Sequence, residues 1–295
     1  NPILIDKFID NAMEVDVDAI SDGKNVFVAG IMQHIEEAGI HSGDSACSLP
    51  PVSIKPFLIK EIENQTIKLA LALKVKGFMN VQYAIKNDKI YVIEVNPRAS
   101  RTVPFVSKAK NLPLAKIASR VMAGEKLTKF NLKSKTKDMF AVKEAVFPFN
   151  KFPNSDLLLG PEMKSTGEVM GFDKNFGMAF AKSQIAASNS LPKKGLAFIS
   201  LKNSHKKEGV ELAKQLIKLN FKLCGTGGTA DYINQHGIHC KKINKVNQGS
   251  PHIVDVLNAK KIALVINTGG GNSETQISDA VALRRATLAL SLIHI

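Results

Sequence analysis

The chain has 295 residues, and its 40 lysines and arginines exceed its 26 aspartates and glutamates to give a net charge of +14. Scattered lysines carry most of this excess, and no aromatic residues are interleaved with them, which argues against a nucleic-acid-binding protein. No apolar run reaches the length of a membrane span, and the three cysteines form no disulfide or zinc pattern, so we expect a cytoplasmic protein without membrane association.

In the first part of the chain, short β-branched runs alternate with helical patterns, and the length predicts about two domains. Strands are predicted over Ile3–Phe8, Val15–Ile20, Val26–His34 and Met139–Val146. Helices are predicted over Glu61–Lys76, where Gly77 would end the helix, and over Val103–Lys110 and Leu114–Met122. The lysine-rich stretch Lys126–Lys137 indicates an exposed connection.

Residues 81–96 form the most informative predicted element, because two alternating apolar runs flank the turn pair Asn87-Asp88. A three-residue loop over 87–89 would set Gln82 opposite Glu94, with Asn96 two residues further on. The other side of this hairpin would then be wholly apolar, formed by Val81, Tyr83, Ile85, Tyr91, Ile93 and Val95.

A carboxylate flanked by two amide oxygens suits a hard cation such as Mg²⁺ or Mn²⁺, which takes one or two carboxylates plus substrate phosphates. Arg98 and Arg101 follow at once and offer planar cationic groups for phosphoryl oxygens. By spacing alone, Glu94 and Asn96 also fit a solvated strand end with a cap, which is the commoner case for so short a motif, and this alternative stays open.

Several long, ordered motifs carry a family resemblance that runs from the first residue to about Leu290. They are EVDVDA from Glu14, GIHSGDSACSLP from Gly39, IEVNPRASRTVPFVSK from Ile93, and FNKFP and LGPEMKSTGEVMG from Phe149 and Leu159. The chain resembles the large subunit of carbamoyl-phosphate synthases, more narrowly the later portion of its second, carbamate-phosphorylating half and the regulatory domain that follows. The resemblance implies part of an ATP-grasp fold, α+β in class.

The resemblance also implies site residues, with ATP and Mg²⁺ or Mn²⁺ as cofactors. Nucleotide contacts map to Lys7, Ile9, Glu14, Gly39, Ile40, His41, Ser42, Gln82 and Glu94. Metal ligands map to Gln82, Glu94 and Asn96, and Arg98 and Arg101 would stabilise charge in transfer. An ornithine-type activator would lie among Glu36, Asp44 and Glu144. Without the resemblance, Ile9 would be ordinary core, His41 a loop histidine and the three acids plain surface residues.

The pattern changes around residues 191–195, so we predict one domain over residues 1–190 and a second over 191–295. The second alternates strands, at Leu196–Leu201, Lys222–Cys224, His239–Ile243 and Ile262–Ile266, with helices at Lys206–Leu219, Thr229–His236, Pro251–Leu257 and Thr275–Leu290. This alternation predicts a small parallel, doubly wound α/β domain.

Two glycine-rich turns follow strands of this domain, at Gly225–Ala230 and Asn267–Gly271, where a doubly wound sheet binds its ligands. The domain resembles methylglyoxal synthase and the regulatory tail of carbamoyl-phosphate synthases. This resemblance implies contacts to a phosphorylated effector from Lys206, Thr226, Thr229, Lys245 and Asn267. Catalysis would need a carboxylate base, and residues 224–229 offer none. We therefore expect regulation rather than catalysis, with Asp231 solvated.

Two departures from the family bear on the ends of the chain and the effector. Members that respond to uridine or inosine monophosphate commonly have further hydroxyls where this chain has residues 268–271, which leaves the effector's identity open. After Leu290, residues 291–295 replace an expected final strand and helix, and Asn1 is expected to lie inside a longer protein.

The resemblance implies a fragment of a synthase that makes carbamoyl phosphate from bicarbonate, glutamine-derived ammonia and ATP for arginine and pyrimidine biosynthesis. Implied partners are a glutaminase small subunit, the remainder of the large subunit, a nucleotide effector and further copies in an oligomer, and the isolated fragment is expected to be inactive. The alternatives are another ATP-grasp ligase or carboxylase and a non-catalytic effector-binding module.

Overall fold

The computed structural model describes residues 3, 9–133, 138–149, 159–189, 192–268, 283, 286 and 287. The chain divides into two compact units, residues 1–147 with 159–187 and residues 188–295 with 148–158. Most of the predicted strand Ile3–Phe8 and most of the predicted helix Thr275–Leu290 lie outside the described residues. The boundary at residue 190 stays a prediction.

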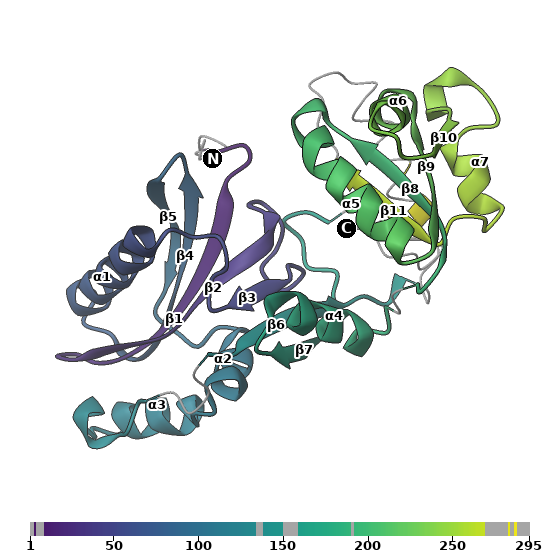
Figure 1. The fold of residues 1–295 in the computed structure, drawn as a ribbon. Coiled ribbons are helices and arrows are strands. Elements are labelled where there is room, and N and C mark those ends of the chain that lie inside the picture. The colour runs from purple at the N-terminus through teal and green to yellow at the C-terminus, as the bar shows by residue number, and fades with distance from the viewer. Residues whose placement is uncertain are drawn as a thin grey trace. The chain divides into compact units, whose positions relative to one another are not determined.

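The first unit is built on a seven-stranded sheet in the order β5-β4-β1-β2-β3-β6-β7, in which every neighbouring pair is antiparallel (Figure 1). The strands are β1 (Met13–Asp22), β2 (Val26–Glu37), β3 (Cys47–Leu49), β4 (Lys76–Lys86), β5 (Lys89–Asn96), β6 (Phe140–Val146) and β7 (Gly167–Asp173). The helices are α1 (Pro56–Ala72), α2 (Val103–Lys110), α3 (Leu114–Met122), a 3-10 turn η1 (Leu127–Lys129) and α4 (Phe176–Ala186).

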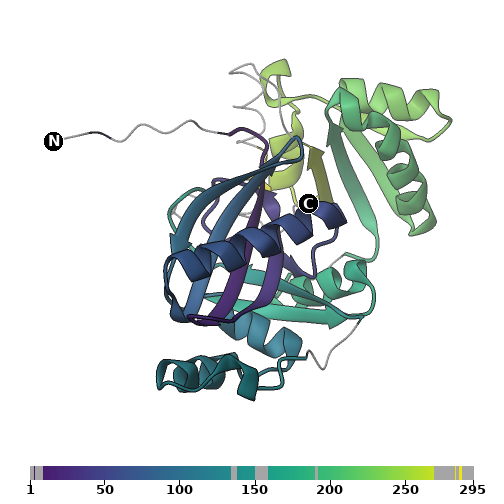
Figure 2. The same cartoon turned by 90° about the vertical axis from the view of Figure 1, so that its left-hand side faces the viewer.

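Helices cover both faces of this sheet, so each face has its own core. Val15 and Val17 of β1 point to the face covered by α1, where they join Leu58 and Ile62. Ile20 points to the opposite face and packs with residues of α2 and α3. Figure 2 shows α1 crossing in front of the strands. Because side chains alternate along a strand, residues 14, 16 and 18 share the face of Ile20.

The helices α2 and α3 have the predicted bounds, but α1 begins five residues before the predicted start and ends four residues before the predicted end. Pro56 starts α1, since proline is tolerated at the first turn of a helix. The helix ends before Lys74, which has a φ of 52°. Gly77 therefore does not stop the helix; it lies inside β4, with a φ of 106°.

The hairpin of β4 and β5 forms, but its loop has two residues rather than the predicted three, because Lys86 pairs with Lys89. Asn87 and Asp88 both have positive φ, which a type I′ turn requires and these residue types tolerate. Ile90 therefore lies opposite Ile85 and Val92 opposite Tyr83, so this face is apolar as predicted. Its predicted members Tyr91 and Ile93 were wrong, because Tyr91 pairs with Ala84 and Ile93 falls at the bulge, and both are exposed. A β-bulge after Gln82 restores the predicted register, and Gln82 pairs with Glu94 as predicted.

The second unit has the predicted parallel sheet, in the order β10-β9-β8-β11. Its elements are β8 (Gly195–Leu201), η3 (Asn203–His205), α5 (Lys206–Lys218), β9 (Phe221–Thr226), α6 (Gly227–Gln235), β10 (Cys240–Ile243), η4 (Val246–Gln248), α7 (Ile253–Asn258) and β11 (Leu264–Thr268). The helices α5 and α6 pack on one face and α7 on the other, which confirms a doubly wound domain.

Candidate active site and effector site

Three acidic residues of β1 form the floor of the candidate active site. Glu14, Asp16 and Asp18 recur at every second position and so share one face of the sheet. All three are almost fully buried, at 5%, 1% and 1% exposure. Buried carboxylates are costly unless they are paired or hydrogen-bonded, so their partners reveal how this face is organised.

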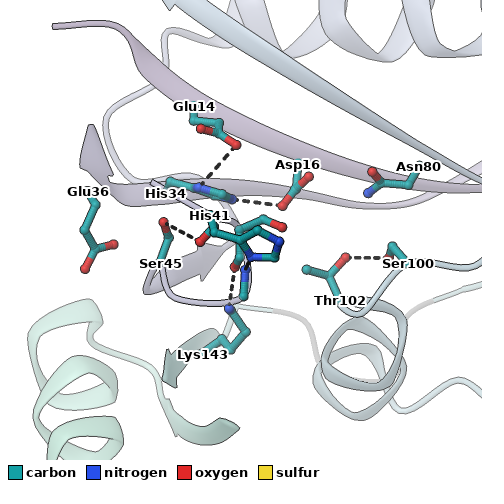
Figure 3. A network of polar contacts seen from close by, with 12 residues as sticks. Glu14, Asp16, His34, Glu36, His41, Ser45, Asn80, Ser100, Thr102 and Lys143 are labelled. Atoms are coloured by element: carbon teal, nitrogen blue, oxygen red, sulfur yellow. Dashed lines mark hydrogen bonds and ion pairs between the residues drawn. The ribbon is translucent and has the colours of Figure 1, made fainter. Parts of the chain in front are cut away.

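His34 of β2 links two of these acids, as Figure 3 shows. Its Nε2 lies 2.9 Å from Oδ2 of Asp16, and its Nδ1 lies 3.8 Å from Oε1 of Glu14. Burial lowers the pKa of His34, but the hydrogen bond and charge of Asp16, with the charge of Glu14, leave that pKa above its ordinary value. For the acid Glu14, burial has the opposite effect and raises the pKa, and the charge of His34 opposes this shift. The two carboxylates thus hold the imidazole between them.

The predicted metal ligands continue this polar face across two further strands. Asp16 lies opposite Gln82 on β4, which in turn lies opposite Glu94 on β5. Asn96 donates from Nδ2 to Oε1 of Glu94 at 2.7 Å, an orientation that leaves its Oδ1 for a cation. Glu94 is exposed, so its carboxylate can meet a ligand from solvent.

This donor set fits Mg²⁺ or Mn²⁺, because one carboxylate and two amide oxygens leave coordination positions for phosphate oxygens and water. Among the residues that the structure describes, no three or more His, Cys, Asp and Glu side chains come together as a metal cluster. A closed, all-protein metal centre is therefore not seen in the described part of the chain. The open set at Gln82, Glu94 and Asn96 remains a prediction.

The segment Gly39–Ser42 lies beside Glu14, in the connection between β2 and β3. The Gly39 N–H donates to Oε2 of Glu14 at 3.4 Å, and Gly39 has a φ of 107°, which favours glycine. The Ser42 carbonyl accepts from Nζ of Lys143 on β6 at 2.9 Å. The structure thus brings Gly39 against Glu14, and the predicted contacts Ile40, His41 and Ser42 follow Gly39 in the chain.

The two remaining predicted nucleotide contacts precede β1. Ile9 is half-buried and has no regular secondary structure, and Lys7 lies outside the described residues. Their roles stay predictions.

The segment that carries Arg98 and Arg101 connects β5 to α2. Both arginine side chains are exposed. Arg98 donates from Nη1 to the carbonyl of Ala99 at 3.0 Å, and Nη1 of Arg101 contacts the sulfur of Met163. Neither arginine forms an ion pair with a carboxylate among the described residues. Their charges are therefore available to an anionic ligand.

Of the three acids predicted to surround an amine activator, Asp44 and Glu144 are buried and Glu36 is half-buried, which makes the plain surface interpretation wrong for Asp44 and Glu144. Burial, followed by the charge of Glu36, raises the pKa of Glu144 to about 8. Gln184 of α4 donates to Glu144 at 2.6 Å. Asp44 uses both oxygens to accept the N–H groups of Lys164 and Ser165 at 2.8 Å each. Asp44 therefore anchors a loop, and any contact with an amine would be in addition to this.

The predicted effector residues of the second unit gather at the carboxyl ends of its strands. Thr226 and Thr229 are buried, and their hydroxyl oxygens lie 3.4 Å apart. Thr229 Oγ1 also accepts the N–H of Leu201 at 3.0 Å. Nδ2 of Asn267 is buried and has no hydrogen-bond partner among the described residues. Lys206 is the first residue of α5 and Lys245 precedes η4.

Sequence reasoning missed several polar residues that complete these sites. Asp16, Asp18 and His34 belong to the first site, and their signal was the alternation of acids in β1 with buried valines. Lys143 is buried at 1% exposure, and nothing in the sequence distinguished it from the other lysines. Ser200 lies opposite Asn267, and its hydroxyl is 3.2 Å from that of Thr226. The signal for Ser200 was a hydroxyl residue near the carboxyl end of the predicted strand Leu196–Leu201.

Comparison with known proteins assigns both units. Residues 1–130 match the model of the carbamoyl-phosphate synthase L chain, ATP binding domain, and residues 208–293 match the MGS-like domain. The chain is 49% identical to the carbamoyl phosphate synthase large chain, C-terminal section, of Aquifex aeolicus, over 99% of this chain and 57% of that section. The chain belongs to the family of carbamoyl-phosphate synthase large chains.

Complete large chains give the same result. Identity is 53% to that of Methanobrevibacter smithii, over 100% of this chain and 28% of the relative, and 54% to that of Rhizobium meliloti, over 98% and 25%. The chain thus spans between a quarter and somewhat over half of the length of these curated relatives. The matches confirm the predicted partial ATP-grasp and methylglyoxal-synthase-like units.

A solved structure, the biotin carboxylase domain of a single-chain bacterial carboxylase, is 19% identical over 48% of this chain and 34% of its own, with a TM-score of 0.42. In the described part of the chain, no helix is both long and apolar enough to cross a membrane.

Proposed function

We propose that this chain is the part of a glutamine-hydrolysing carbamoyl-phosphate synthase in which carbamate attacks the γ-phosphoryl group of ATP. One observation carries the proposal. Gln82 and Glu94 are direct cross-strand neighbours on the same sheet face as Glu14, next to the Gly39–Ser42 segment. A nucleotide held at Glu14 would therefore extend its phosphates over the row that ends at Glu94.

The residues of this face have complementary tasks. Glu14 accepts hydrogen bonds from ribose hydroxyls, and the Gly39 backbone permits close approach of the nucleotide. Gln82, Glu94 and Asn96 would hold Mg²⁺ or Mn²⁺, which would neutralise negative charge on the phosphates of a bound nucleotide. Arg98 and Arg101 provide guanidinium groups for the charge on the transferred phosphoryl group.

We infer that the second unit binds a phosphorylated effector and regulates the enzyme. The start of α6, where the N-cap Thr226 makes no side-chain cap hydrogen bond, offers backbone donors to a phosphate. Lys206 and Lys245 add positive charge, and the Asn267 amide, which has no hydrogen-bond partner among the described residues, adds a further donor. Glu36 and Glu144 would similarly accept the amine of an ornithine-type activator, since two neighbouring carboxylates lower their mutual repulsion by binding a cation.

The partners and the location belong to the same proposal. The remainder of the large chain supplies the rest of the nucleotide site, and a glutaminase small subunit supplies ammonia within an oligomer. The enzyme would feed arginine and pyrimidine synthesis in the cytoplasm, where a reducing environment is compatible with the three buried, unpaired cysteines Cys47, Cys224 and Cys240.

The test is phosphoryl transfer from carbamoyl phosphate to ADP, measured as ATP formation by the complete enzyme. Arg98→Ala and Arg101→Ala should each lower kcat by about a hundredfold or more, since arginines that stabilise transferring phosphoryl groups contribute 10³- to 10⁵-fold in well-studied cases. Arg120→Ala is the matched control, because Arg120 lies on α3, pairs with Glu125 and stacks on Phe130. Equal rates for all three variants and the wild type would overturn the assignment.

A further inference from the structure

The segment between β5 and α2 carries both arginines, yet it has no strand or helix of its own to fix them. Arg101 lies at a turn, one residue before the N-cap Thr102 of α2. Ordering a long arginine side chain costs rotamer entropy. Such a side chain can therefore stabilise a bound phosphoryl group effectively only when its backbone is already held in place. What holds the segment therefore bears directly on phosphoryl transfer.

The two residues on either side of Arg101 are attached to one buried carboxylate. Ser100 donates to Oδ1 of Asp18 at 2.7 Å, and Thr102 donates to Oδ2 at 2.6 Å. The two hydroxyl oxygens lie 2.7 Å from each other, and Figure 3 shows this pair beside the start of α2. The backbone of Arg101 is thus held on both sides by the same acid.

Asp18 is itself held firmly within the sheet. It lies in the middle of β1, its exposure is 1%, and Asn80 of β4 donates to its Oδ1 at 3.0 Å. Asn80 lies opposite Asn96, one of the proposed metal ligands, on the next strand. The carboxylate of Asp18 therefore ties the arginine segment to the strands that carry the proposed metal set.

The chemistry of the site favours a carboxylate for this task. Two oxygens, each with two acceptor positions, can take both hydroxyl protons and the Asn80 amide, whereas an amide side chain offers one acceptor oxygen. Burying a carboxylate is unfavourable by itself, and here burial raises the pKa of Asp18 to about 6, against the opposing effect of the three donors. Ordinary strand packing would be served better by an apolar residue, as at Ile20 on the same face.

We propose that Asp18 is a positioning residue for phosphoryl transfer, which fixes Arg101 over the nucleotide face by holding Ser100 and Thr102. This inference rests on the proposed function, because Arg101 matters only if this face transfers a phosphoryl group. Asp18 has no need to touch the substrate. Its contribution passes through Arg101 and is absent when the guanidinium is absent.

The test is a double-mutant cycle in the complete enzyme, with ATP formation from carbamoyl phosphate and ADP as the readout. Asp18→Asn should lower kcat by about ten- to a hundredfold and leave the KM for ADP nearly unchanged, because the arginine acts on charge that develops in transfer. In the Arg101→Ala background the same substitution should change kcat by less than about twofold. Ser100→Ala combined with Thr102→Val should reproduce the effect from the other side of the contact.

The matched control is Asp22→Asn on the same strand. Asp22 also anchors a loop, since its Oδ2 accepts the N–H of Leu127 at 2.8 Å, but that loop carries neither arginine. We expect any stability loss in this variant to leave kcat within about twofold of wild type.

The outcomes separate the two proposals. If Arg101→Ala leaves kcat unchanged, the proposed role of Arg101 fails and the inference about Asp18 fails with it. If Arg101→Ala lowers kcat, but Asp18→Asn lowers kcat as much in the Arg101→Ala background as in the wild type, only the inference about Asp18 is overturned. Should Asp18→Asn fail to fold, the Ser100→Ala and Thr102→Val pair decides the same question, because these changes leave the buried carboxylate in place.

Discussion

The Nε2 atom of His34 lies 2.9 Å from Oδ2 of Asp16, and both side chains are almost completely buried. This pair is the centre of the polar face, because Asp16 also lies opposite Gln82 of β4 and His34 also contacts Glu14. A buried charged pair contributes little beyond an apolar pair of the same shape, but losing one partner is costly.

Asp16→Ala should therefore destabilise the chain by about 3–5 kcal/mol, since it leaves the imidazole of His34 buried without its partner. The control is Glu63→Ala, which removes an exposed pair with Lys60 on α1 and should cost no more than about 1 kcal/mol. Urea unfolding of the 295-residue chain measures both. A cost for Asp16→Ala equal to that of the control would contradict the buried pair.

Glu144 predicts a pH dependence of stability. Its pKa of about 8 lies above the ordinary value of 4.5, so the folded state holds the proton more tightly than the unfolded state. Its favourable contribution is complete below about pH 4.5 and is lost as the pH rises to about 8, with a slope of up to about 1.4 kcal/mol per pH unit.

Glu144→Gln should remove this slope, so the stability of the variant relative to the wild type should be greater at pH 8 than at pH 5. The amide oxygen of the glutamine can still accept the hydrogen bond from Gln184. The measurement is the free energy of unfolding at pH 5, 6.5 and 8 for both proteins. A wild-type stability that rises over this range relative to the variant would show that the shift has the opposite sign.

The metal site predicts the behaviour of Glu94→Gln in the complete enzyme. Glu94 supplies the one full negative charge of the proposed ligand set, so its loss should weaken metal binding more than the loss of either amide. We expect ATP formation from carbamoyl phosphate to fall by about a hundredfold or more, with partial recovery at high Mn²⁺. Glu61→Gln, an exposed change on α1, serves as the control. Activity of Glu94→Gln equal to the wild type would sink the metal assignment.

The second unit predicts a phosphate contact at Lys245. Charge-assisted contacts of this kind are worth about 1.5–3 kcal/mol, so Lys245→Ala should weaken binding of a nucleoside monophosphate by roughly ten- to a hundredfold. Calorimetric titration of the complete large chain with uridine and inosine monophosphates measures this, and Lys261→Ala on the exposed surface is the control. Unchanged affinity in Lys245→Ala, or no binding by the wild type, would refute the proposed pocket.

The sequence by itself determined those elements whose pattern is local. The helices α2 and α3 have their predicted bounds because apolar spacing, Pro104 near one start and Gly124 after the other end are all visible in the chain. The pairing of Gln82 with Glu94 was also predictable, since burial of one face fixes the register of a hairpin. The long motifs fixed the family, which the comparisons confirmed.

Only the tertiary structure decided which polar groups meet. Asp18 and Thr102 are 84 positions apart, and no periodicity in either segment shows that the two side chains share a hydrogen bond. The same holds for Lys143, which looks like a surface lysine in the sequence and is buried against the Ser42 carbonyl. Local patterns specify faces and periods, whereas buried hydrogen bonds depend on which strands of an antiparallel sheet become neighbours, and that order is a property of the whole fold.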